Sequence, residues 1–166
     1  DVAAVSATGD DGADGSDRGG AAYLFDVTTG AQIAKLVAFD GAAGDYFGFS
    51  VAILGDIVAV GASGDDGYTG SVYLFSAVDG AFLAKVTASD YETGDWFGAS
   101  AAIDGDTLLV GARSADLGTL NGVGAVYAYD LSALTAAPAD VPLPAGVWLL
   151  SGALGLLGLR GRKARA

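Results

Sequence analysis

The chain of 166 residues contains no cysteine and no histidine. Without cysteine it can form no disulfide framework, and it has no thiolate to act as a nucleophile or a metal ligand. Without histidine it lacks the commonest general base and the commonest metal ligand. A Ser-His-Asp triad or a zinc site built on histidine therefore cannot be assembled from this chain.

Proline is scarce, with 3 residues, whereas glycine is abundant, with 27, and 52% of the positions are hydrophobic. Valine, tyrosine and phenylalanine are frequent between the glycines. This composition indicates short strands joined by tight turns rather than disorder. We therefore expect an all-β fold.

Charge is divided unevenly along the sequence. Residues 1–140 hold all 20 acidic residues but only 4 of the 8 basic ones, which gives this part a net charge of −16. Such a surface repels nucleic acid and anionic lipid, and it favours solubility and the attraction of cations. We expect no nucleic-acid partner.

A short phrase occurs twice, as "GDYFGFS" at 44–50 and as "GDWFGAS" at 94–100, and it reveals a period of 50 residues. Periods of 20–50 residues indicate stacked units that cannot bury their faces alone. Within the complete unit, 47–96, strands are predicted at 50–54, 56–62, 71–77 and 82–88. The run "IVAV" lacks polar alternation, which is typical of a strand covered on both faces. Four antiparallel strands at this period form the blade of a β-propeller.

The segments "FGFSVAILGDIVAVGASGDD" and "FGASAAIDGDTLLVGARSAD" resemble FG-GAP repeats, the blades of integrin-α-type propellers. The resemblance covers roughly residues 1–134. The repeated aromatic ring is expected to wedge between neighbouring blades, and the glycine after it to allow close backbone approach or a positive φ. The residues that carry the resemblance are Phe47, Gly48, Gly61, Ala62, Phe97, Gly98, Gly111 and Ala112. Their expected role is structural.

The repeats predict a partial propeller of about two and a half blades. A partial blade is expected at 1–46, a full blade at 47–96 and a second partial blade at 97–134. A closed propeller needs 4–8 blades. Since the chain opens inside a predicted strand, we expect it to be a piece of a longer protein.

Integrin-type blades bind calcium through an acidic loop between their first and second strands, but here that connection is only the turn Gly55-Asp56 or Gly105-Asp106. A second candidate lies between the second and third strands of the first unit. Its potential calcium ligands are Asp10, Asp11, Asp14 and Asp17. Solvated turns, in which aspartate bonds its own backbone, are the favoured interpretation. No cofactor is therefore predicted, with calcium at these four carboxylates as the alternative.

Other polar residues also repeat. Asp40 and Asp45 return as Asp90 and Asp95, and Lys35 returns as Lys85. A catalytic pair is expected once rather than in every unit. The aspartates are therefore predicted to close turns between blades, and the lysines to be structural.

The composition changes after Leu134. A small-residue linker at 135–140 precedes "VPLPA" at 141–145, a hydrophobic helix predicted at 146–159 and the basic end "RGRKARA". The uncharged stretch at 145–159 would be roughly 22 Å long as a helix, which is short for a membrane core of ~30 Å. The positive-inside rule places the basic end in the cytoplasm and the repeats outside.

This order of motif, short span and basic terminus resembles the bacterial VPLPA-CTERM sorting signals, relatives of the PEP-CTERM class that exosortase-type enzymes process. The matching residues are Val141, Pro142, Leu143, Pro144 and Ala145. The resemblance implies a Gram-negative envelope. The protein would lie in the inner membrane before processing and at the cell surface or outside the cell afterwards, near matrix or exopolysaccharide.

Three functions are compatible with these observations. The leading hypothesis is a non-enzymatic surface or secreted propeller for adhesion or matrix interaction. The second is a propeller hydrolase whose active site lies in a part of the protein before this chain. The third is a repeat protein that assembles with itself in the presence of cations, through exposed blade edges.

Overall fold

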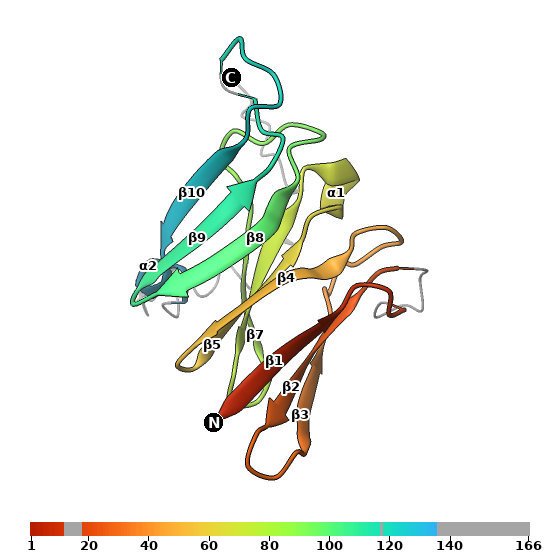
Figure 1. The fold of residues 1–166 in the computed structure, drawn as a ribbon, viewed down its shortest axis with the longest axis vertical. Coiled ribbons are helices and arrows are strands. Elements are labelled where there is room, and N and C mark those ends of the chain that lie inside the picture. Colours follow the sequence, from red (N-terminus) through yellow and green to blue (C-terminus); the bar gives the residue numbers. More distant parts are fainter. Residues whose placement is uncertain (12–17, 117, 136–166) are drawn as a thin grey trace, which may run out of the picture. The chain divides into compact units, whose positions relative to one another are not determined.

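The computed structural model describes residues 1–11, 18–116 and 118–135, which form three antiparallel β-sheets (Figure 1). The first sheet contains β1 (Val2–Ala7), β2 (Ala21–Asp26) and β3 (Gln32–Leu36). The second sheet contains β4 (Phe47–Leu54), β5 (Ile57–Ala62), β6 (Ser71–Ser76) and β7 (Phe82–Val86). The third sheet contains β8 (Phe97–Asp104), β9 (Thr107–Ala112) and β10 (Ala125–Asp130). Two short segments accompany the sheets in the described residues: α1 (Asp65–Tyr68), a tight turn with positive φ from Asp66 to Tyr68, and α2 (Leu131–Thr135), a helical turn.

The predicted four-stranded meander is confirmed in the second sheet, whose strands follow one another in the order β4-β5-β6-β7. Its hairpin turn is the predicted Gly55-Asp56, because Leu54 pairs directly with Ile57. The first strand begins earlier than the predicted residue 50. Phe47 already pairs with Ala62, and a bulge separates this pair from the regular register that starts at Ser50.

The three sheets repeat one pattern of pairing. Strands β1, β2 and β3 correspond to β5, β6 and β7, since Val2 pairs with Asp26 as Ile57 pairs with Ser76. Strands β8, β9 and β10 correspond in the same way to β4, β5 and β6. Each sheet is thus a copy, or part of a copy, of one supersecondary unit.

The second sheet lies between the other two, and its central strands β5 and β6 are covered on both faces (Figure 1). Strand β5 is buried from Val58 to Ala62, as its lack of polar alternation predicted. The corresponding strand β9 alternates between buried and exposed residues, because only one of its faces packs against a sheet. The position of a sheet in the stack therefore decides how its strands are buried.

Two hydrophobic clusters fill the joints between sheets. The first brings Leu24 and Leu36 of the first sheet together with Val58 and Tyr73 of the second. The second cluster joins the opposite face of the second sheet to the third, with the residues Ala59, Val72, Leu74, Val86, Leu108 and Val110 among its members. Burial of these apolar faces is the main force that holds neighbouring sheets together.

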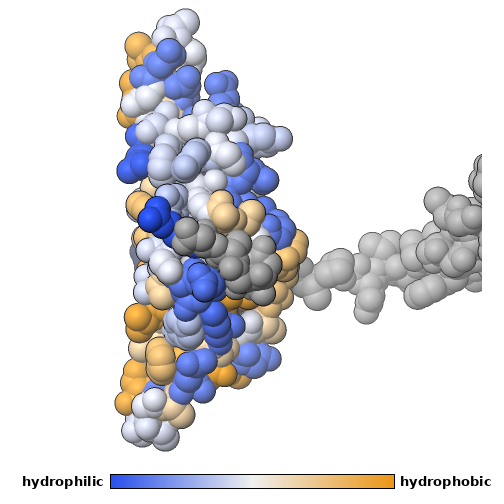
Figure 2. Space-filling view, turned by 90° about the vertical axis from the view of Figure 1, so that its right-hand side faces the viewer, coloured by the Kyte–Doolittle hydropathy of each residue, from blue (hydrophilic) through white to orange (hydrophobic). Residues whose placement is uncertain are grey.

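The surface of the described residues mixes hydrophilic and hydrophobic side chains. In Figure 2 the hydrophobic residues, in orange, gather along the left edge of the view. Among the large hydrophobic side chains with high exposure are Leu109, Val123 and Val126 of the third sheet and its β9–β10 loop.

Of the predicted linker at 135–140 the structure describes only Thr135, which ends α2. The rest of the linker, the sorting motif at 141–145 and the hydrophobic helix predicted at 146–159 lie outside the described residues. No helix within residues 1–11, 18–116 and 118–135 has the length and apolar character needed to cross a membrane.

Candidate functional site

The repeated Phe-Gly phrase lies at the joints between sheets. The side chains of Phe47 and Phe97 are completely buried, and each belongs to one of the two hydrophobic clusters. The Phe47 ring meets the rings of Tyr73 and Phe75 edge to face, with centroid distances of 5.5 and 5.9 Å. The Phe97 ring does the same with Tyr127 at 5.4 Å. Edge-to-face pairs of this kind stabilise beyond the area they bury.

The backbone crosses the same joints. Phe47 N donates to Gly19 O at 3.0 Å, and Phe97 N donates to Thr69 O at 2.9 Å. Gly48 and Gly98, which follow the two phenylalanines, have φ values of +89° and +83°. A Cβ on either would lie within 2.6 Å of a carbonyl oxygen of the preceding sheet, so only glycine fits.

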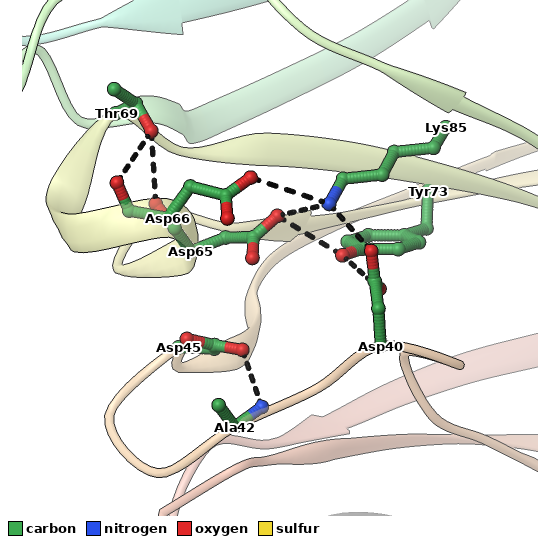
Figure 3. A network of polar contacts seen from close by, with 8 residues as sticks. All are labelled: Asp40, Ala42, Asp45, Asp65, Asp66, Thr69, Tyr73 and Lys85. Carbon is green, nitrogen blue, oxygen red and sulfur yellow. Dashed lines mark hydrogen bonds and ion pairs between the residues drawn. The ribbon is translucent and has the colours of Figure 1, made fainter.

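A polar network lies beside the first joint and centres on Lys85 from β7 (Figure 3). Lys85 Nζ is 2.8 Å from Asp40 Oδ2 and 2.8 Å from Asp65 Oδ2. The single hydroxyl hydrogen of Tyr73 is shared between Asp40 Oδ1, at 2.7 Å from the hydroxyl oxygen, and Asp65 Oδ2, at 3.0 Å. The ammonium also lies 5.1 Å from the centre of the Tyr73 ring, within cation–π range. Asp65 is buried, and these two donors compensate for its desolvation.

The electrostatics of the network keep its donors protonated. Burial alone would lower the pKa of Lys85, but its hydrogen bonds with Asp40 and Asp65 outweigh burial and raise that pKa. Burial and the hydrogen bond to Asp40 raise the pKa of the Tyr73 hydroxyl far above its usual range. Burial favours the neutral form of Asp40, yet the hydrogen bonds from Lys85 and Tyr73 prevail and lower the pKa of its carboxyl. Lys85 and Tyr73 therefore act as donors and not as bases near neutral pH.

Asp45 occupies a separate position in the same region (Figure 3). Its Oδ2 accepts a hydrogen bond from Ala42 N at 2.6 Å, and its repeat Asp95 accepts from Glu92 N at 2.7 Å. Burial, with a smaller contribution from the neighbouring carboxylate of Asp65, raises the pKa of Asp45. These aspartates close local turns, as their sequence positions predicted.

Asp40 and Asp90 differ from the sequence prediction, which made them turn-closing residues as well. Asp40 reaches across to Tyr73 and Lys85, and Asp90 accepts from Tyr127 OH at 2.8 Å. Burial and this hydrogen bond raise the pKa of Tyr127 to about 12. Asp40 and Asp90 therefore each connect the loop between two sheets to side chains on the strands of the following sheet.

The first sheet contains a reduced copy of the network. Asp10 Oδ1 accepts from Lys35 at 2.7 Å, and its other carboxylate oxygen accepts from Tyr23 OH. Both hydrogen bonds lower the pKa of the Asp10 carboxyl, and the bond from Lys35 has the larger effect. The repeated lysines thus have a structural environment in both sheets. Asp65, however, was not singled out from the sequence, although its place in the repeated Gly-Asp-Asp could have indicated it.

The structure places the four candidate calcium ligands as follows. Asp10 is bonded as described and Asp11 is exposed, whereas Asp14 and Asp17 lie outside the described residues. In residues 1–11, 18–116 and 118–135 no group of three or more acidic side chains is arranged to hold a metal ion.

The family's calcium loop does not fit this chain. The β4–β5 and β8–β9 connections are two-residue turns with one carboxylate each, Asp56 and Asp106. Calcium takes 6–8 oxygen ligands, which such a turn cannot supply.

The model of the FG-GAP repeat family matches the chain at residues 31–75 and 81–129, which together make up more than half of its length. Each match contains one Phe-Gly phrase and spans the last strand of one sheet and the first three strands of the next. No curated protein matches the chain. The chain belongs to the FG-GAP repeat family.

Proposed function

We propose that this protein is a non-enzymatic bacterial surface or secreted protein whose FG-GAP sheets are blades of a β-propeller used for adhesion or for contact with the extracellular matrix. The observation that carries the proposal is the use of the repeated residues. The repeated phenylalanines and glycines form the joints between sheets. The repeated lysines and aspartates form the polar networks beside those joints or close nearby turns. A protein built in this way presents a rigid scaffold for recognition by its loops.

The state of the ionisable groups supports a binding role over catalysis. The pKa values of Lys85 and Tyr73 are raised, so neither group is poised as a base or a nucleophile near neutral pH. Asp10 has both carboxylate oxygens engaged. The acidic surface is suited to a soluble exported domain that avoids nucleic acid and anionic lipid.

The sequence of the tail supports export and sorting. In this proposal an exosortase-type enzyme recognises residues 141–145 and removes the basic end, so that the mature protein leaves the inner membrane for the cell surface or the medium. The two prolines of the motif favour an extended backbone, which a processing enzyme can bind. Matrix or exopolysaccharide components are the proposed partners after release.

Mass spectrometry of the exported protein in its native host tests the proposal. We expect the mature protein without "RGRKARA", and we expect Pro142→Ala combined with Pro144→Ala to leave the full-length form in the inner membrane. Pro138→Ala, in the linker before the motif, is the matched control and should be processed normally. An exported wild-type protein that keeps its basic end would show that the tail is an anchor.

A further inference from the structure

The two joints between sheets share a receptor for the Phe-Gly segment. At the first joint the loop before β2 accepts β4, and at the second joint the loop before β6 accepts β8. A left-handed glycine lies at the centre of this receptor, Gly20 with φ +84° and Gly70 with φ +85°. A Cβ on either glycine would lie 2.0 Å from the carbonyl oxygen of Phe47 or Phe97, which shows how closely the segment approaches.

Two further residues of the second sheet complete its receptor. Ser50 Oγ donates to Gly98 O at 2.9 Å. Gly61 faces the same oxygen, since a Cβ on Gly61 would lie 2.1 Å from Gly98 O. A serine, a glycine and a left-handed glycine thus surround the Phe-Gly segment of the third sheet.

The third sheet has the same three residues in the same places. Ser100 and Gly111 are paired across β8 and β9 as Ser50 and Gly61 are paired across β4 and β5. Gly124, with φ +80°, precedes β10 just as the left-handed glycine of the second sheet precedes β6.

This third receptor is open among the described residues. It forms a hollow of about 560 Å³, and its lining includes Ser100, Gly111, Val123, Gly124, Ala125 and Val126. At Gly111 a Cβ would meet only atoms of Ser100 within 4 Å. Val126 is 73% exposed, whereas Val72, which occupies its position in the second sheet, is completely buried under the third sheet. The residues that receive a neighbour in one sheet are therefore presented to solvent in the next.

We propose that this hollow binds an extended peptide segment of the type Gly-Asp-aromatic-Phe-Gly, the opening strand of an FG-GAP sheet additional to the three in the printed sequence. The phenylalanine amide of the segment donates to Val123 O, as Phe97 N does to Thr69 O. Ser100 donates to the carbonyl oxygen of the glycine, as Ser50 does to Gly98 O. Such pairing of an extended segment with exposed backbone is a known mode of peptide recognition.

A second copy of this chain is not the expected occupant. Phe47 and Phe97 are both completely buried in joints of their own chain, so a folded copy has neither segment to offer. The segment must therefore come from another FG-GAP sheet.

Nuclear magnetic resonance of the ¹⁵N-labelled full chain, titrated with a peptide of residues 93–104, tests this inference. The peptide carries the chain's own "GDWFG" phrase, and titration to about 1 mM detects even weak binding. We expect saturable shifts of the backbone amides of Ser100, Gly111 and Gly124. The same peptide with Gly98→Val should cause none, because the added side chain would meet the receptor backbone.

Two protein variants sharpen the test. Gly111→Val fills the hollow and should weaken binding at least tenfold, provided that its spectrum remains that of a folded protein. Val78→Thr, at an exposed residue outside the hollow, is the control and should bind as the wild type does. Absence of saturable shifts with the wild-type peptide, or equal shifts with the Gly98→Val peptide, would overturn the inference. Shifts of the same amides that follow protein concentration without peptide would identify a second copy as the occupant and would also overturn it.

Discussion

The backbone oxygen of Thr69 accepts a hydrogen bond from the backbone nitrogen of Phe97 at 2.9 Å, across the joint between the second and third sheets. A residue that ends one loop is thereby fixed to the first residue of the next sheet. Because the contact uses backbone atoms, its geometry depends on how closely the two backbone segments approach and not on side-chain type. The glycines beside it are consequently the most restricted positions of the joint.

The first prediction concerns Gly70, which combines a left-handed backbone with a Cβ position 2.0 Å from Phe97 O. Gly70→Ala should lower the free energy of unfolding by more than the roughly 1–2 kcal/mol that a left-handed backbone alone costs a residue with a Cβ. Gly30→Ala is the matched control, since Gly30 has φ +73° but open space around its Cβ position. Urea denaturation that gives equal losses for the two variants would show that the close approach contributes nothing.

The second prediction concerns the two repeated lysines. Lys85→Met should destabilise the protein by about 2 kcal/mol or more, because it leaves the buried carboxylate of Asp65 without its cation. Lys35→Met should cost less than about 1 kcal/mol, since its ion pair with Asp10 is exposed. Thermal and chemical denaturation of the two variants measure the difference. An equal effect of both substitutions would contradict the assigned burial of the Lys85 network.

The third prediction concerns the pH dependence of stability. The pKa of Asp45 is raised in the folded protein, mainly by burial, so ionisation of this group costs stability as the pH rises through that range. Asp45→Asn removes this cost and its amide oxygen can still accept from Ala42 N. The variant should therefore be more stable than the wild type at neutral pH, with a gain that disappears in acid, where Asp45 is protonated.

Asp40 should show the opposite pH dependence. The hydrogen bonds from Lys85 and Tyr73 outweigh burial and lower its pKa, so its contribution is present at neutral pH and is lost as the pH falls through the folded pKa. Asp40→Asn should therefore be less stable than the wild type at neutral pH and similar to it in acid. Denaturation curves from about pH 3 to pH 7 compare both variants, and parallel curves for the two would refute the assignment.

Much of the fold was predictable because the sequence repeat marks where the strands of each unit lie. The 50-residue period gave the strands of the second sheet, and the unbroken "IVAV" run predicted a strand covered on both faces. The early start at Phe47 was missed, since a bulge leaves no mark in hydrophobic alternation. The turn α1 and the helical turn α2 were missed because four or five residues are too few to show a period in the sequence.

The polar network was harder to predict from the sequence. Asp65 and Lys85 are 20 residues apart, and no local pattern shows that β7 brings the ammonium beside the loop before β6. Asp40 was predicted to close a turn because its own neighbours suit one, yet a distant tyrosine and lysine provide its partners. The matching repetition of tyrosine and lysine in the first and second units is the signal that could have indicated this network.

The most direct test of the account is the free energy of unfolding of Phe97→Ala. If the repeated phrase is the structural joint between sheets, loss of this completely buried ring should cost about 3–5 kcal/mol. Phe49→Ala is the matched control, because Phe49 is 42% exposed and its loss should cost clearly less than the loss of Phe97. A loss below about 1 kcal/mol for Phe97→Ala, or no difference from the control, would contradict the account.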